Sequence, residues 1–496
     1  MEWDYPAHWR PLCKWLSVLL LFSLTAVSPT AGASPANPVP APLSLRDCID
    51  IALKNNHSIT VSRFSVEIAE EQHRQALSAY WPQVGIKAAY AVMDEDPNFI
   101  FPASTVNTPA MTVQFPNPMV PGSSIPVQVP PSSVNIPQQN VKLMDRENFY
   151  ATLNATLPLY TGGKIRSIER QAEQGVRAAR EEARRTDLQV IYDVKRYYYG
   201  AVLAGELLRI GRDTLARMEV TLELTENLYT RGSGRVKKTD FLRNKTVVEG
   251  LRGAVSALEA NEKLAKAALA NAMGIDWNSH VEVAEERLPY APVNAELKDL
   301  VSDAYRFNPD WASLEAGLKA AEAKVDEARS GHFPTIALFG NLTRIVNSYD
   351  AGLVTPANKN SWTVGVGLEL PIFNGLRTTA ETREAGARLG RLKEQQVLLR
   401  EGLALQVKNI FIRMVSARQQ KESSEAAAAA AEENRSLNER AYQAELVETK
   451  DVIEAQLIES LMKAQYQKAL YDHLEAAANL DFVVGNEVKE LISGAP

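Results

Sequence analysis

Two acidic side chains near the end of the chain have a spacing that could attract ions to a passage. Asp451 and Glu454 are three positions apart, so on a helix they lie on one face. Copies of this pair around a common axis would concentrate negative charge and attract cations. The same carboxylates could also form an ordinary solvated helix start, where acidic side chains stabilise the N-terminus. Both interpretations stay open from the sequence.

A basic segment occupies a turn in the first half of the chain. Its charged members are Arg231, Arg235, Lys237, Lys238 and Arg243. The glycines at 232 and 234 could form a phosphate-binding loop, but helical patterns on both sides favour a hairpin turn. Contact with a partner protein or simple solvation would also account for these charges.

Other motifs for catalysis or metal binding are absent from the sequence. Its histidines show no ligand spacing, and no P-loop or dinucleotide-binding turn precedes a suitable helix. Beyond the first 33 residues Cys48 is the only cysteine, so no intrachain disulfide is possible. The formal charge of −6 argues against a general nucleic-acid binder. We therefore expect no enzyme activity, no cofactor and no metal site.

The N-terminus has the pattern of a secretory signal peptide, residues 1–33. Arg10 and Lys14 precede an apolar run over 15–27, and small residues follow at 31–33. A membrane anchor is the alternative, although the run is shorter than the ~20 residues that a spanning helix needs. Cys13 precedes the apolar run, which argues against a lipid-attached mature N-terminus. A Pro- and Ala-rich linker follows at 34–42.

Four segments alternate apolar and polar residues with a period of two: 84–92, 149–157, 336–342 and 362–370. Each is close to the ~9–11 residues of a tilted membrane strand. A half-buried strand of a soluble sheet would show the same alternation. The first two strands are joined by the Pro-rich residues 94–147, which predict an extended loop because proline forbids helix and interrupts strand ladders.

Two very long helices follow the second and fourth strands. No proline occurs over 164–229 or 376–442, and about 66 helical residues make a rod of roughly 100 Å. Such rods are held by coiled-coil packing. Shorter helices are predicted over 45–79, 239–273, 297–330 and 451–482. The junctions between strands and long helices carry the turn residues Pro158, Gly162, Gly163, Pro371 and Gly375.

The two halves of the chain are a duplication. Asp47 pairs with Asp299 at an offset of 252, and Gly274 pairs with Gly485 at an offset of 211. The repeats cover 43–274 and 295–485, with a linker at 275–294 expected at the waist and a tail at 486–496.

Four membrane strands cannot close a barrel, because an open edge in hydrocarbon leaves backbone groups unpaired at several kcal/mol each. Copies of the chain must therefore join, each giving four strands and two helical hairpins. Composition does not choose between two, three or four copies.

The sequence resembles the TolC-like outer-membrane efflux proteins over essentially the whole chain after the signal. The resemblance rests on the duplicated layout, on Leu-Pro-Leu-Tyr-Thr-Gly-Gly at 157–163 and Leu-Pro-Ile-Phe-Asn-Gly at 370–375, and on Asp-Val-Ile-Glu-Ala-Gln at 451–456. It implies a mixed α and β fold in which a homotrimer completes a 12-stranded β-barrel in outer-membrane lipid and an α-helical periplasmic tunnel. It also implies a periplasmic adaptor and an inner-membrane pump of the RND, ABC or MFS class as partners.

The same resemblance assigns roles at the hairpin tips. Tyr442 matches a gate tyrosine, Thr239 and Asp240 match its partner, and Asp451 and Glu454 match acidic rings that line the aperture. Val447 replaces a gate arginine and Glu445 replaces a turn glycine. We hypothesise that the basic first tip pairs instead with the acidic second tip (Glu445, Glu448 and Asp451) of a neighbouring hairpin.

The leading functional hypothesis is a passive exit duct for efflux or type I secretion. The alternative is a coiled-coil structural or adhesive outer-membrane protein with no conducting lumen.

Overall fold

The structure is a computed structural model that describes residues 42–485, apart from 233–235, 291, 293–294 and 445. The expected signal peptide, almost all of the 34–42 linker and the tail at 486–496 therefore lie outside the described residues, as do Arg235 and Glu445. From Leu43 onward the described chain forms one compact unit.

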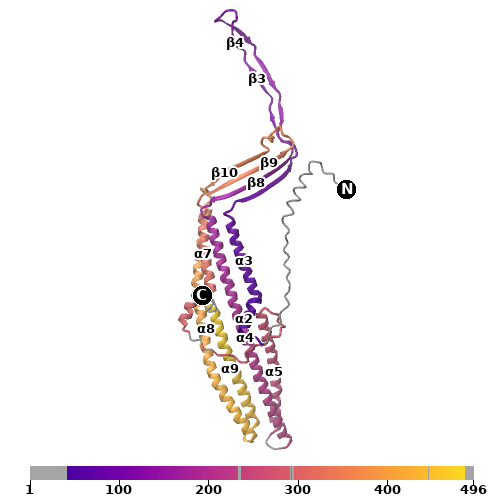
Figure 1. The fold of residues 1–496 in the computed structure, drawn as a ribbon, viewed down its shortest axis with the longest axis vertical. Helices are drawn as coiled ribbons and strands as arrows, with labels where there is room; N and C mark the ends of the chain where they lie inside the picture. Colours follow the sequence, from indigo (N-terminus) through magenta and orange to yellow (C-terminus); the bar gives the residue numbers. More distant parts are fainter. Residues whose placement is uncertain (1–41, 233–235, 291, 293–294, 445, 486–496) are drawn as a thin grey trace, which may run out of the picture. The chain divides into compact units, whose positions relative to one another are not determined.

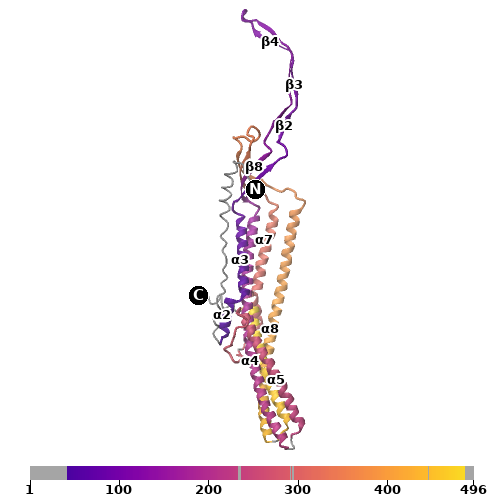
Figure 2. The same cartoon turned by 90° about the vertical axis from the view of Figure 1, so that its right-hand side faces the viewer.

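The helices follow the same order in both halves of the chain (Figures 1 and 2). The first half contains α2 (Leu45–Asn55), α3 (His57–Ser78), α4 (Lys164–Thr230) and α5 (Lys238–Ala272). The second half contains α6 (Leu297–Phe307), α7 (Pro309–Ser330), α8 (Arg377–Gln443) and α9 (Thr449–Val484). α4 and α8 are both 67 residues long, which corresponds to rods of about 100 Å.

None of the helices in the described part of the chain is long and apolar enough to span a membrane.

The prediction of single helices over 45–79 and 297–330 is wrong, because an asparagine interrupts each one. Asn56 and Asn308 have extended backbones, with ψ of 123° and 126°. Asn56 Oδ1 accepts a hydrogen bond from the Ser58 N–H (2.8 Å), and Asn308 Oδ1 accepts one from the Trp311 N–H (3.1 Å). Each asparagine therefore ends one helix and caps the next.

At the first of these breaks, Asn56 connects the start of α3 with the end of α5. The Asn56 side-chain amide donates to the carbonyl of Ala272, at the end of α5 (2.8 Å), and α3 and α5 both pack along α4. Gly274 follows with φ of 70°, and a Cβ there would lie 2.5 Å from the carbonyl oxygen of Asn55. Glycine is required by both the conformation and the close approach.

The four predicted strands form one antiparallel sheet in the order β1–β8–β9–β10. Their bounds are β1 (Gln83–Val92), β8 (Glu147–Tyr160), β9 (Thr335–Asn347) and β10 (Asn360–Glu369). Ile86 opposes Leu153, which opposes Leu342, which opposes Trp362. Directly opposed residues share a face, so one apolar face runs across all four strands.

The helices beside the sheet keep the order of the strands. α3 leads into β1, β8 into α4, α7 into β9 and β10 into α8. α3 packs on α4, α4 on α7 and α7 on α8. The sheet and the helix layer are consequently open at the same two edges, β1 with α3 and β10 with α8.

The Pro-rich segment is paired rather than a loop without ladders, which corrects the prediction for 94–147. Three short ladders form a ribbon that continues the β1–β8 hairpin (Figure 1). They join β2 (Asn98–Phe101) with β7 (Gln139–Lys142), β3 (Ser104–Thr108) with β6 (Ser132–Ile136), and β4 (Met111–Pro116) with β5 (Ser124–Val129). Prolines such as Pro102, Pro109 and Pro130 stand between ladders, where no inter-strand N–H is needed.

Candidate functional site

The two hairpins, α4–α5 and α8–α9, are held together near their tips. Met218 of α4, Val248 of α5 and Ile453 of α9 form a buried apolar cluster, with Leu215 and Leu457 packed against it. α4 of the first hairpin also packs on α9 of the second. The tips of one chain therefore form a common four-helix end (Figure 2).

The Tyr442 side chain lies inside this end, where it is 7% exposed. Its hydroxyl is 3.2 Å from Thr225 Oγ1 of α4 and 3.0 Å from Thr449 Oγ1 of α9. The Asn244 amide of α5 reaches the same Thr225 hydroxyl at 3.4 Å. One polar network thus links all four helices across the two hairpins.

The structure does not bring the predicted gate residues together within one chain. Thr239 is exposed at the start of α5, and no hydrogen bond connects Tyr442 to Thr239 or Asp240 among the described residues. Thr225, Asn244 and Thr449 are the partners that the sequence analysis missed. Each of them is a polar residue on the buried face of its helix. That face can be recognised only once the packing of the four helices is known.

Asp240 and Asp451 occupy equivalent places, 211 positions apart, and both cap their helices. Asp240 Oδ2 accepts from the Lys237 N–H and Asp451 Oδ2 from the Glu448 N–H, each at 3.0 Å. The helix-start interpretation of Asp451 therefore describes its contacts within one chain. Glu454 is exposed on the next turn, so its carboxylate is available outside the bundle.

The basic first tip stays exposed. Arg231 is the C-cap of α4, Lys237 is the N-cap of α5, and Lys238 is the first residue of α5. Among the described residues no ion pair joins them to the second tip, where Glu448 pairs with Lys450 at 3.1 Å. The hydrogen bond with Glu448 raises the pKa of Lys450, and the positive charge of Arg243 from the first hairpin opposes this shift. The predicted pairing of the two tips is not made within one chain.

A buried ion cluster lies further along the hairpins from the tips, and the sequence analysis did not predict it. Glu459 of α9 is fully buried, with its carboxylate 2.8 Å from Arg435 of α8, 2.8 Å from Lys463 and 3.5 Å from Arg217 of α4. Arg435 also contacts Glu439 at 2.5 Å. A buried charge needs such partners, because losing one of them costs about 3–5 kcal/mol. The cluster ties the two hairpins together a second time.

The strand–helix junctions use left-handed backbone. Gly162 and Gly163 have φ of 62° and 88°, and a Cβ at Gly162 would lie 2.6 Å from the Cβ of Phe333. Gly375 has φ of 66°, but its neighbour Leu376 takes φ of 65°, where the first repeat has a glycine. Pro158 lies in β8 next to a shift in register, and Pro371 follows β10.

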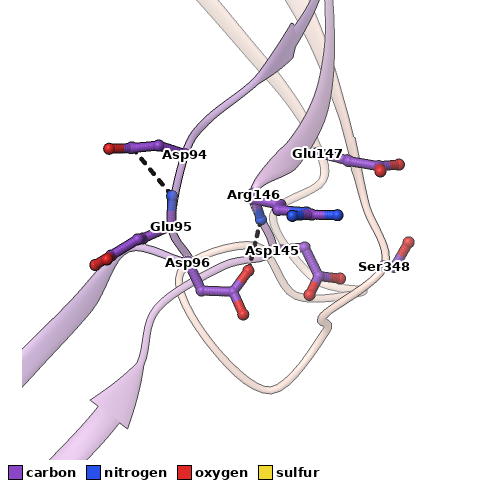
Figure 3. Close-up of a pocket in the computed structure, with 7 residues that line it drawn as sticks. All are labelled: Asp94, Glu95, Asp96, Asp145, Arg146, Glu147 and Ser348. Carbon is purple, nitrogen blue, oxygen red and sulfur yellow. Dashed lines mark hydrogen bonds between the residues drawn. The ribbon is translucent and has the colours of Figure 1, made fainter.

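Charged side chains gather at the base of the ribbon, and we call this group the collar (Figure 3). A pocket of about 500 Å³ is lined there by Asp94, Glu95, Asp96, Asp145, Arg146, Glu147 and Ser348. Lys142 pairs with Asp96 at 2.8 Å and with Asp145 at 2.5 Å. Within the described ranges no group of three or more side chains is arranged to hold a metal ion.

The fold and the paired hairpins match a known class of membrane transport proteins. A family model described as "Outer membrane efflux protein" matches residues 137–275 and 300–486. The chain belongs to the outer membrane efflux protein family, and it is an outer-membrane protein. The resemblance found in the sequence is thereby confirmed.

Curated relatives are similar over part of the chain. The "Probable outer membrane lipoprotein SilC" of Salmonella typhimurium is 26% identical over 250 residues, 50% of this chain and 52% of that protein. "Nodulation protein T" of Rhizobium leguminosarum bv. trifolii is 24% identical over 64% of this chain and 67% of that protein. The "Cation efflux system protein CusC" of Escherichia coli K12 is 25% identical over 47% and 50%. The chain thus spans about half the length of most of these curated relatives.

Solved structures share the fold over most of their length. A membrane protein from Pseudomonas aeruginosa has a TM-score of 0.69 and 20% identity, covering 89% of this chain and 90% of that one. The outer membrane protein VceC from Vibrio cholerae has a TM-score of 0.68 and 16% identity, covering 89% and 96%.

Proposed function

We propose that the chain is one segment of an outer-membrane duct, and that copies join side by side to close it. The observation that carries this proposal is the pair of matching open edges, β1 with α3 and β10 with α8. β1 and β10 run in opposite directions, so the free edge of one copy can pair with the other free edge of the next. Closing the ring satisfies the backbone groups that hydrocarbon would otherwise leave unpaired.

Exposed apolar stripes lie on the same edge helices. On α8 the stripe consists of Leu398, Leu405 and Ile412, seven residues apart and opposite the buried face of that helix. On α3 it consists of Val61, Phe64 and Ile68. Neither stripe packs on its own chain, and both would be covered by a neighbouring copy.

In this proposal the assembly is a homotrimer with a twelve-stranded barrel and a helical periplasmic tunnel, built from the repeats 43–274 and 295–485. It conducts solutes passively and without catalysis from a periplasmic adaptor and an inner-membrane pump to the exterior. Support comes from the family and from relatives whose names describe efflux. Drug efflux and type I secretion are the two uses that fit such a duct.

The test introduces a charge into the α8 stripe. Leu405 is 68% exposed in one chain, and Leu405→Glu would place a carboxylate in the apolar stripe that a neighbouring copy would have to desolvate, at a cost of several kcal/mol. We expect the yield of detergent-extracted oligomer, and of channels in planar bilayers, to fall more than tenfold. Gln406→Glu is the matched control, because that exposed residue lies off the stripe. Equal loss in both variants, or wild-type protein without discrete channels, would favour a non-conducting structural protein.

We also propose that the hairpin tips gate the duct and that Asp451 and Glu454 line its aperture. Asp451→Asn keeps a side-chain oxygen for the helix cap, so Asp451→Asn with Glu454→Gln removes charge without removing the cap. Cation selectivity in bilayers should fall in this double variant and stay unchanged in Glu433→Gln, which removes a carboxylate from an exposed position of α8 outside the tips. Unchanged selectivity in both would leave Asp451 a helix cap only.

A further inference from the structure

The ribbon between β1 and β8 carries no charged residue beyond its base. Residues 97–141 contain no acidic, basic or histidine residue, although such acidic and basic residues make up 23% of the chain. Charges are one of the usual means by which exposed strands avoid pairing with other chains. The ribbon lacks them on every strand except at Lys142, which ends β7 in the collar.

The outer ladder of the ribbon is amphipathic. One face consists of the opposed pairs Met111–Val129, Val113–Val127 and Phe115–Ile125. The other face consists of the opposed pairs Thr112–Gln128, Gln114–Pro126 and Pro116–Ser124. Met111 is 58% exposed and Phe115 is 52% exposed in one chain. The other ladders also expose opposed apolar pairs, Val106 with Val134 and Phe99 with Val141.

The base of the ribbon is fixed to the sheet. The Arg146 N–H donates to Asp96 (2.8 Å), and the Asp145 N–H donates to Asn347, at the end of β9 (3.1 Å). The Leu353 N–H donates to the Leu143 carbonyl at 2.8 Å, which adds a bond to the loop after β9. In a ring of copies, every ribbon would therefore start at an equivalent fixed position. That position lies next to β1, the free edge of the sheet.

A two-stranded ribbon with an uncovered apolar face is marginally stable in water. Ribbons tethered to one ring meet at high effective concentration, and without charges identical copies do not repel one another. We propose that ribbons from neighbouring copies pack their β4–β5 apolar faces together beyond the collar, as a common uncharged extension of the assembly. The occupant of the apolar face is thus a second copy of this chain, and the proposal rests on the ring of copies proposed above.

The experiment compares two adjacent positions on opposite faces, Val127→Cys and Gln128→Cys. Cys48 is buried and gives little background. In the purified oligomer, a short bis-maleimide should link copies through Val127→Cys about tenfold more efficiently than through Gln128→Cys. Adding Phe115→Asp should abolish the Val127→Cys product, and adding Gln114→Asp, on the polar face, should preserve it.

The outcomes separate this proposal from the proposed function. A conducting oligomer in which both cysteines link equally, or not at all, would overturn the ribbon contact and leave the ring intact. Protection of Val127→Cys from a maleimide only when lipid vesicles are added, without links between copies, would overturn it in favour of a lipid-facing ribbon. Absence of any oligomer would refute the ring itself.

Discussion

Asn56 and Asn308 make the same contacts at equivalent places in the two repeats. The Asn56 amide donates to the Ala272 carbonyl (2.8 Å), and the Asn308 amide donates to the Val483 carbonyl (2.9 Å). Asn308 follows Asn56 by 252 positions and Val483 follows Ala272 by 211, the same offsets that pair Asp47 with Asp299 and Gly274 with Gly485. Asn56 thus connects α3 with the end of α5, and Asn308 connects α7 with the end of α9.

Replacing either asparagine by alanine removes a helix cap and a side-chain hydrogen bond, which is partly buried at Asn56 and buried at Asn308. We expect Asn56→Ala or Asn308→Ala to destabilise the protein by about 2 kcal/mol. Thermal unfolding followed by circular dichroism, at fixed protein concentration, measures the change. Asn55→Ala, one position earlier on an exposed site, is the control and should change little. An equal loss from Asn55→Ala would contradict the role of Asn56.

Leu376 holds a left-handed backbone that favours glycine. It has φ of 65° and is 67% exposed, so Leu376→Gly should stabilise the protein by about 0.5–1 kcal/mol. Leu376→Asn should give part of that stabilisation, because asparagine tolerates this conformation. Leu376→Val should destabilise the protein, because valine is β-branched. The reverse change in the first repeat, Gly163→Leu, should destabilise. Denaturant unfolding of the four variants should give this ranking.

The Tyr442 hydroxyl holds the two hairpins together at their tips. Tyr442→Phe keeps the ring but removes hydrogen bonds worth about 1 kcal/mol each. If the tips gate the duct, channels in planar bilayers should open more often. Tyr229→Phe is the control, because Tyr229 stacks on Phe241 and its hydroxyl has no hydrogen-bond partner within the described residues. A shared phenotype would indicate a general loss of stability.

Glu459 balances three cations inside the hairpin bundle. Glu459→Gln leaves Arg217, Arg435 and Lys463 without their common carboxylate, and the expected loss of stability is about 3 kcal/mol. Glu433→Gln, at an exposed position of α8, should be neutral. Limited trypsin digestion should cut the hairpins faster only in the first variant, and equal rates would contradict the role of the cluster.

Cys48 is a buried free thiol that should react only after unfolding. Burial raises its pKa from 9.0 to about 12, so little thiolate exists at pH 8. Maleimide labelling should require denaturant. Because the folded pKa is the higher one, the contribution of this thiol to stability is complete below pH 9 and is lost as the pH rises from 9 toward 12. Cys48→Ser should remove that part of the alkaline loss, which pH-dependent unfolding can measure.

The sequence by itself determined the strands, the long helices and the duplication. Alternation with a period of two, proline-free runs and paired glycines are local signals, and they identified β1, β8, β9, β10, α4 and α8 to within a few residues. The motifs at 157–163 and 370–375 also carried the family. These features depend on neighbours in the chain, which is why a sequence reveals them.

Only the tertiary structure decided which residues meet. Asn56 lies in a pattern that reads as continuous helix, and its break is stabilised by Ala272, more than 200 positions away. Tyr442 forms a hydrogen bond with Thr225, and Glu459 forms an ion pair with Arg217, and both contacts join the two hairpins. The ribbon pairs strands whose many prolines argued locally against any ladder. In each case the stabilising partner is distant in sequence. The contact therefore produces no pattern among neighbouring residues from which it could be predicted.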